Sequence, residues 1–312
     1  MNRLIRNIFR EQLNRGLMIP VVNTLLMDRT TRQNIFWNTD EYKEYGDGFQ
    51  PEDEITPDLV CGDRGALLQP RIAKDKELQG KRTLEHAEVF TPLWICNLQN
   101  NLLDKAWFGT ANIFNTMNGT KWITHHHKIV FPNEPNKNWT DYVDNKRLEI
   151  TCGEAPYVVS PYDTITGQKI SLENRIGILD RKLRIVNENT QNESEWFNWT
   201  LRAFQSTFGF ECQGDSLTIA RLNLLLTFVE NLFYKWNRLA TKKELDQIAR
   251  IISWNFWQMD GLTGTVPGGK PEMQYESQDL FASTNTTELK PSCRIMDWRN
   301  LKKSFIFRKI YE

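Results

Sequence analysis

Residues 208–236 read FGFECQGDSLTIARLNLLLTFVENLFYKW, and this stretch decides the fold. A short apolar run that ends at Glu211 is typical of a buried strand. A polar turn follows, and from Leu217 onward apolar residues recur at helical spacing. The stretch therefore predicts a strand, a tight turn and a long amphipathic helix, with Glu211 at the carboxyl end of the strand.

Two other stretches have the same character. Residues 147–158 (RLEITCGEAPYV) are an apolar run that ends in a turn of small residues, and residues 251–262 (IISWNFWQMDGL) are an apolar run that ends in a polar turn. We expect strands at 147–151, 207–211 and 252–256. Residues 173–205 between the first two have helical spacing. Repeated strand–turn–helix units predict an α/β fold with a doubly wound parallel sheet, in which ligands bind beyond the carboxyl ends of the strands.

The composition excludes several classes of protein. The 312 residues are 12% aromatic, which argues against a disordered chain. Lys and Arg number 39, as do Asp and Glu, so the basic excess of a protein that grips nucleic acid by charge alone is absent. The five cysteines form no C-x-x-C pair, which favours reduced thiols over a disulfide framework or a zinc site. Charged residues interrupt the apolar runs, so we expect a cytoplasmic protein without a membrane span.

The pattern along the chain suggests two regions. We expect residues 1–85 to form a helical and irregular N-terminal region, with an amphipathic helix at 3–18. Residues 86–312 are expected to form the second domain. Within it, residues 263–292 are rich in Gly, Pro, Ser and Thr and predict a loop. Residues 293–310 alternate apolar and polar residues around a charged turn and predict a hairpin.

The three predicted strand ends carry polar or small residues that suit a nucleoside ligand. Cys152 and Gly153 are small, so the backbone there can approach a ligand closely. Glu211 can accept hydrogen bonds from ribose hydroxyls, and Asp260 can accept one from an exocyclic amine, with Phe256 available to stack. The alternative for each acid taken alone is an ordinary helix cap or turn residue.

The order of these segments resembles the adenine-N6 DNA methyltransferases of restriction–modification systems, as arranged in type I modification subunits and type IIG enzymes. Residues 89–92 (VFTP) resemble the F-T-P motif that opens the cofactor pocket of the family. Residues 149–155 resemble its acid-Pro-x-Cys-Gly-x-Gly motif, with Ala155 in place of the last glycine. Residues 209–226 are similar to its Gly-x-Glu-x-Asp-Pro motif and Ala-Arg-x-Asn-Leu helix, although Gln213-Gly214 replaces Asp-Pro.

The resemblance covers roughly residues 85–265 and implies S-adenosylmethionine as the cofactor. Within the first glycine motif, Cys152 and Gly153 would face the amino-acid part of that cofactor. Glu211 would bind the ribose, and Asp260 with Phe256 or Trp257 would bind the adenine. Phe90 would close the pocket together with its neighbours. The cofactor-binding residues implied are Phe90, Thr91, Pro92, Glu149, Cys152, Gly153, Glu211, Phe256 and Asp260.

One motif of the family is missing. Its catalytic tetrapeptide, Asn/Asp/Ser-Pro-Pro-aromatic, has no counterpart after Asp260, and SPYD at 160–163 lies on the wrong strand connection and suggests a Ser-Pro turn. No catalytic residue is therefore assigned. The 52 residues after Asp260 are also too few for the rest of the sheet and a target-reading domain, so we expect DNA to be engaged through partner subunits.

Three functions are compatible with these observations. The first is a cofactor-binding adenine-N6 DNA methyltransferase subunit of a restriction–modification or phage-defence system. The alternative is a degenerate methyltransferase that acts as a structural or cofactor-sensing subunit. An RNA or protein substrate is a third reading. The run His125-His126-His127 favours a polar surface segment over a metal site, because adjacent side chains alternate faces in a strand.

Overall fold

The computed structural model describes residues 11, 18–61, 68–74, 80, 91–268, 272–274, 287–300 and 303–307. Its helices are α2 (Ile19–Leu26), α3 (Pro57–Val60), α5 (Leu93–Phe108), α6 (Trp139–Asp144), α7 (Ile178–Asn189), α8 (Glu193–Gln205), α9 (Gly214–Trp236) and α10 (Lys242–Asn255). Its strands are β1 (Asn115–Asn118), β2 (Lys121–Thr124), β3 (Arg147–Glu149), β4 (Thr207–Glu211), β5 (Phe256–Gln258), β6 (Glu272–Gln274), β7 (Thr287–Leu289), β8 (Arg294–Asp297) and β9 (Lys303–Ile306). The chain is a mixed α/β protein.

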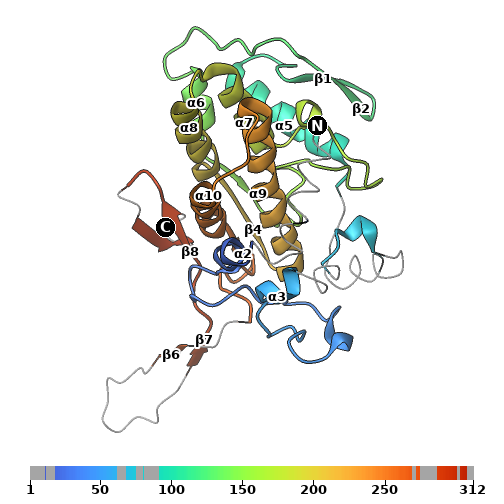
Figure 1. The fold of residues 1–312 in the computed structure, drawn as a ribbon, viewed down its shortest axis with the longest axis vertical. Coiled ribbons are helices and arrows are strands. Elements are labelled where there is room, and N and C mark those ends of the chain that lie inside the picture. Colours follow the sequence, from blue (N-terminus) through green and yellow to red (C-terminus); the bar gives the residue numbers. More distant parts are fainter. Residues whose placement is uncertain are drawn as a thin grey trace.

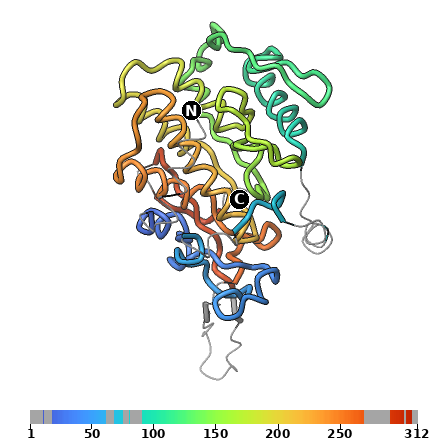
Figure 2. Tube along the Cα trace, turned by 45° about the vertical axis from the view of Figure 1, so that its right-hand side comes forward, coloured from blue at the N-terminus to red at the C-terminus, as the bar shows by residue number. Residues whose placement is uncertain are grey.

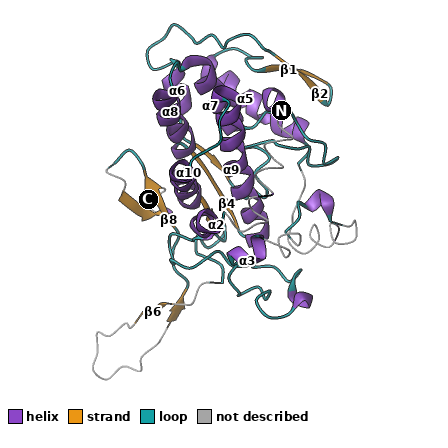
Figure 3. Ribbon diagram, viewed as in Figure 1, coloured by secondary structure: helices purple, strands orange, loops and turns teal. Residues whose placement is uncertain are grey.

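The sheet that organises the fold has three parallel strands in the order β3-β4-β5. Glu149 of β3 lies opposite Gly209 of β4, and Glu211 lies opposite Gln258 of β5. The pair α7 and α8 connects the first two strands, and α9 and α10 connect the next two. Figure 3 shows these four helices gathered in front of β4. The predicted parallel pairing is confirmed, and β4 spans 207–211 as expected.

The two faces of this sheet are covered differently. Phe256 belongs to the large core that includes buried residues of α9 such as Leu224. On the opposite face, Phe210 and Trp257 pack in a smaller core with Phe307, which follows β9. The hairpin of β8 and β9 is antiparallel and confirms the hairpin predicted at 293–310.

Within residues 18–61, Phe36 and Asn38 contact the carboxyl ends of β5 and β4, whereas α2 packs against α10. Figures 1 and 2 both place this blue segment at one end of the molecule, with the β1–β2 hairpin at the other end. The backbone N–H of Phe36 donates to the Gln258 side chain at 2.8 Å, and Gln258 donates back to the Phe36 carbonyl at 2.9 Å. A Cβ atom on Gly214 would lie 1.8 Å from the same carbonyl oxygen. Glycine at this position therefore lets the segment approach the start of α9.

The predicted strand within 251–262 begins later than expected. Residues 251–255 form the last turn of α10, and the strand is β5 at 256–258. Helix α10 begins with a capping box formed by Thr241 and Glu244, and it buries Ile251 and Ile252 on its apolar face. A continuous apolar run fits a buried helix and a buried strand equally well, which is why the start was misplaced.

Two other predictions meet the structure only in part. The segment 263–292, expected to be a loop, contains β6 and β7, which pair antiparallel at 272–274 and 287–289. The helix predicted at 3–18 lies outside the described residues except for its positions 11 and 18.

Helix α9 is the one helix among the described residues that is long and apolar enough to cross a membrane. Of its apolar window, 78% is buried inside the protein. This burial is that of a core helix, which is consistent with a soluble protein.

Candidate functional site at the carboxyl ends of the strands

Glu211 joins the ends of β3 and β4 through its carboxylate. The backbone N–H of Gly153, which follows β3, donates to Glu211 Oε2 at 2.8 Å. The N–H groups of Cys212 and Gln213 donate to Glu211 Oε1 at 2.8 and 3.1 Å. Two residues predicted to bind one ligand are thus in direct contact.

The loop after β3 is a tight turn built from small residues. Thr151, Gly153 and Ala155 have φ angles of 49°, 54° and 65°, in the left-handed region that most side chains avoid. Between them, the N–H of Cys152 donates to the Phe210 carbonyl at 2.8 Å and continues the sheet ladder. The turn keeps the backbone of residues 151–155 next to the end of β4.

Gly209 lies where the three predicted strand segments, 147–158, 207–211 and 251–262, come together. A Cβ atom there would lie 2.7 Å from the Phe256 ring and 3.3 Å from Cys152 Sγ. Phe256, at 1% exposure, is the first residue of β5 and packs in the core. Trp257 is buried on the other face of the sheet. Phe256 and Trp257 are thus each buried in a hydrophobic core, one on each face of the sheet.

Asp260 lies two residues beyond β5 and organises a turn. Its Oδ1 accepts from the N–H groups of Leu262 and Thr263 at 2.8 and 3.2 Å. The strand before it is joined to β4, because the N–H of Met259 donates to the Glu211 carbonyl at 3.0 Å. Asp260 therefore sits at the same edge as Glu211 and also fills the turn role given as the alternative.

Glu149 is the acid at the end of β3, and its charge acts on Cys96 near the start of α5. It is half-buried, and this burial raises its pKa to about 7. Its charge in turn raises the pKa of the Cys96 thiol on α5, after the larger effect of burial. The Thr91 carbonyl accepts from Cys96 and from Thr164 Oγ1, at 3.8 and 3.1 Å.

Of the predicted F-T-P segment, Thr91 and Pro92 therefore lie at the start of α5, the helix on which Cys96 senses the charge of Glu149. Thr91 and Pro92 are half-buried and lie directly before Leu93, the first residue of α5. Phe90 lies outside the described residues.

Two polar residues of α9 have structural roles that sequence reasoning missed. Arg221 is fully buried, and its Nε donates to the Phe256 carbonyl at 2.8 Å. Asn223 donates to the Glu154 carbonyl and to the Tyr162 hydroxyl, each at 3.3 Å. The Ala-Arg-x-Asn-Leu pattern singled out both residues, but only the contacts show that they tie α9 to β5 and to the loop after β3.

The SPYD segment and the histidine run at 125–127 have structural roles. Asp163 of SPYD accepts from two backbone N–H groups within its own turn, at 3.0 and 2.7 Å. Among the described residues, no group of three His, Cys, Asp or Glu could hold a metal ion. His125 instead hydrogen-bonds Thr116 Oγ1 at 2.9 Å and stacks on His127.

Glu149 should make stability depend on pH. An acid whose pKa rises from 4.5 to about 7 on folding stabilises the fold fully below pH 4.5, and the contribution is lost as pH rises through 7. We expect the free energy of unfolding to fall by about 2–3 kcal/mol between pH 4.5 and 7.5 relative to Glu149→Gln. Urea denaturation of the parent protein and of Glu149→Gln across this pH range measures the difference in the free energy of unfolding. Parallel pH profiles would contradict the assignment.

No protein-family model, curated protein or solved structure matches this chain.

Proposed function

We propose that the chain is an S-adenosylmethionine-binding subunit similar to adenine-N6 DNA methyltransferases, in a bacterial restriction–modification or phage-defence system. Its three parallel strands would be part of a doubly wound, methyltransferase-like sheet. The observation that carries the proposal is the contact of Gly153 with Glu211 at 2.8 Å, at the edge where Asp260 also lies.

The chemistry of these residues fits the cofactor. S-adenosylmethionine carries an ammonium group, two ribose hydroxyls and an adenine amine, all of which donate hydrogen bonds. Carboxyl groups stand at three adjacent strand ends, those of Glu149, Glu211 and Asp260, and carboxyl oxygens accept hydrogen bonds. The cofactor also has a net positive charge, which acidic residues favour. When bound, it would supply an electrophilic methyl group.

The alternative is a degenerate methyltransferase that acts as a structural or cofactor-sensing subunit. It is favoured by the missing Pro-Pro-aromatic tetrapeptide after Asp260. The net charge of zero also supports DNA binding through partner subunits rather than by this chain alone.

Calorimetric titration with S-adenosylmethionine tests the cofactor binding that both proposed functions require. We expect the parent protein to bind and Glu211→Ala to bind about 10- to 100-fold more weakly, because a hydrogen bond to a charged acceptor contributes about 1.5–3 kcal/mol. Asp163→Ala is the matched control, since it removes a carboxylate that bonds only within its own turn.

Circular dichroism should show that each variant is folded. Absence of binding by the folded parent protein, or equal affinity of the parent and Glu211→Ala, would refute the cofactor site.

A further inference from the structure

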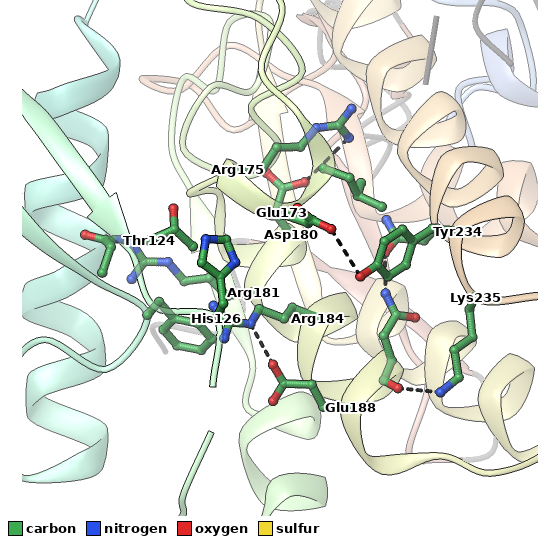
Figure 4. Close-up of a pocket in the computed structure, with 15 residues that line it drawn as sticks. Thr124, His126, Glu173, Arg175, Asp180, Arg181, Arg184, Glu188, Tyr234 and Lys235 are labelled. Carbon is green, nitrogen blue, oxygen red and sulfur yellow. Dashed lines mark hydrogen bonds and ion pairs between the residues drawn. The ribbon is translucent and has the colours of Figure 1, made fainter. Parts of the chain in front are cut away.

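A polar cavity of about 510 Å³ lies between the β1–β2 hairpin, α7 and the last turns of α9. Figure 4 shows several of the polar side chains around it in contact with one another. Arg184 bonds Glu188 at 2.7 Å, and the Tyr234 hydroxyl contacts Glu173 at 3.5 Å. Lys235 donates to a backbone carbonyl at 2.6 Å. Charged side chains without such partners lie elsewhere, on strand β3 at the edge of the parallel sheet.

Strand β3 is the outer strand of this sheet and has a free edge. The order β3-β4-β5 gives it one neighbouring strand within the described part of the chain. The N–H of Arg147 donates to the Ser206 carbonyl at 2.9 Å, on the side of β4. Because successive residues of a strand turn their N–H and C=O groups to opposite sides, those of Leu148 point to the free edge. This edge can therefore accept a further strand.

The side chains beside the free edge are apolar and exposed. Leu148 lies opposite Phe208 of β4, and hence on the face of the sheet that the smaller core covers. Phe208 packs against that core, but Leu148 and Ile150 are 39% and 63% exposed. Sheets made only of parallel strands occur almost only with both faces covered. The exposure of these two side chains therefore indicates a contact surface at β3.

Two half-buried charged residues flank Leu148. Within the described part of the chain, the side chains of Arg147 and Glu149 form no hydrogen bond and no ion pair. Both lie on the face opposite to Leu148, because side chains alternate along a strand. Burying an unpaired charge costs free energy. A strand that adds to β3 is therefore favoured if it presents an acid to Arg147 and a base to Glu149.

A second copy of the same strand has this pattern when it runs antiparallel. With a two-fold axis at Leu148, Arg147 of each copy lies opposite Glu149 of the other, and the two Leu148 residues exchange N–H···O bonds. The Arg147 and Glu149 positions are then the closely spaced pairs of the ladder, with Cβ atoms about 4.5–5.5 Å apart. The net charge of zero adds no repulsion between copies.

We propose that two copies of this chain associate through the free edges of β3, which joins their parallel sheets into one. Sedimentation velocity of the purified chain over a wide range of protein concentration tests this without cofactor or DNA, and so independently of S-adenosylmethionine binding. We expect the parent chain to shift from monomer to dimer as its concentration rises.

Charge reversal tests the pairing of Arg147 with Glu149. Arg147→Glu and Glu149→Lys should each weaken dimerisation about 10-fold or more, since each replaces two attractive pairs by two repulsive ones. An equimolar mixture of the two variants should dimerise about as well as the parent, because both opposite-charge pairs are restored. Lys243→Glu, a charge reversal at an exposed position on α10, is the matched control and should dimerise like the parent.

Leu148→Pro tests the backbone pairing. Proline removes the N–H that points to the free edge, and it is tolerated on an edge strand at such a position. We expect no dimer from this variant. Leu148→Ala keeps the N–H and should dimerise more weakly than the parent but better than the proline variant. Circular dichroism should show that each variant is folded; if Glu149→Lys is not, Arg147→Glu and Leu148→Pro decide alone.

Dimerisation of the parent should also strengthen as pH rises. Burial raises the pKa of Glu149 in the single chain to about 7, so the residue is mostly protonated at pH 5.5 and mostly ionised at pH 8. The pKa values of its titratable neighbours, Cys96, Cys152 and Tyr157, are all raised by burial, so these groups stay neutral over this range. Only ionised Glu149 attracts Arg147 of the other copy, so Glu149→Gln should lose the pH dependence.

Four results would overturn the proposal. They are a parent chain that stays monomeric at every concentration, folded charge-reversal variants that dimerise as well as the parent, a mixture of these variants that does not dimerise, and a dimer that persists in Leu148→Pro. The last result would place the contact on another surface of the molecule.

Discussion

Replacing Arg221 with leucine should lower the free energy of unfolding by about 3–5 kcal/mol, the largest effect expected of any single substitution proposed for this chain. The side chain is fully buried, and its guanidinium donates to the carbonyls of Phe256 and Leu25 at 2.8 and 2.5 Å. Longer bonds reach the carbonyls of Met27 and Ser253 at 3.3 and 3.5 Å. Removing the donor leaves buried carbonyl groups unpaired, at about 1–3 kcal/mol each.

The buried charge of Arg221 also depends on its partners. Burial lowers the pKa of this guanidinium to about 9, and the nearby Asp28 partly offsets the effect. A buried charged group is found where it is paired or hydrogen-bonded. Here it joins α9 to β5, to the end of α2 and to the last turn of α10.

Chemical denaturation of the parent, Arg221→Leu and Arg202→Leu measures this prediction. Arg202 is partly exposed and pairs with Asp144, so its loss should cost no more than about 1 kcal/mol. Similar losses for the two variants would show that Arg221 does not tie these elements together.

The segments with the clearest periodicity were predicted well from the sequence. Residues 208–236 form a strand, a turn and a helix as expected, because the apolar repeat after the polar turn is too long for a strand and the run before it is too short for a helix. The hairpin at 293–310 was likewise evident from its alternation. These elements are specified by local pattern alone.

The N-terminal contacts could not be predicted, because they depend on tertiary structure. Residues 37–66 are acidic and rich in Gly and Pro, which predicts a loop with at most one short strand. Yet Trp37 is completely buried, and its carbonyl accepts from the N–H of Gly214 at 2.9 Å. The only sign in the sequence was the replacement of Asp-Pro by Gln213-Gly214, whose reason is visible only once Phe36 is placed beside it.

The candidate site could likewise be predicted only in part from the sequence. The order of acids and glycines along the chain predicted that Gly153, Glu211 and Asp260 would share one edge of the sheet, and parallel strands place them there. The placement of the aromatic residues was not predictable, because the start of β5 was misplaced. With β5 at 256–258, Phe256 lies at the amino end of the strand and packs against Gly209.

Incubated alone with radiolabelled S-adenosylmethionine and DNA of mixed sequence, the chain should transfer no label above a protein-free control. Methyl transfer requires the adenine amine to be held in line, within about 3–3.5 Å of the methyl carbon. An extruded base also needs a polar acceptor and an aromatic face to hold it. Under the proposed cofactor binding, Glu211 and Asp260 are committed to the cofactor, and Phe256 and Trp257 are buried.

The first pair of Asn, Asp or Ser with an aromatic residue after Asp260 is Asp297-Trp298, and it lies at the wrong edge of the sheet. Asp297 accepts from the N–H groups of Arg299 and Asn300 in the β8–β9 turn. The Trp298 indole donates to Asn255, which directly precedes β5, at 2.7 Å. The pair therefore sits at the amino ends of the strands, whereas Glu211 marks their carboxyl ends.

The assay is run with the parent chain, with Asp297→Ala, and with each after addition of the products of neighbouring genes. We expect label in DNA only when a partner is present, and equal incorporation by the parent and Asp297→Ala, because the Asp297 carboxylate serves only its own turn. Incorporation by the isolated parent chain that disappears in Asp297→Ala would refute this reasoning and make Asp297 a catalytic residue. Label that depends on a partner and on Glu211 would instead show that this chain holds the cofactor while another subunit positions the base.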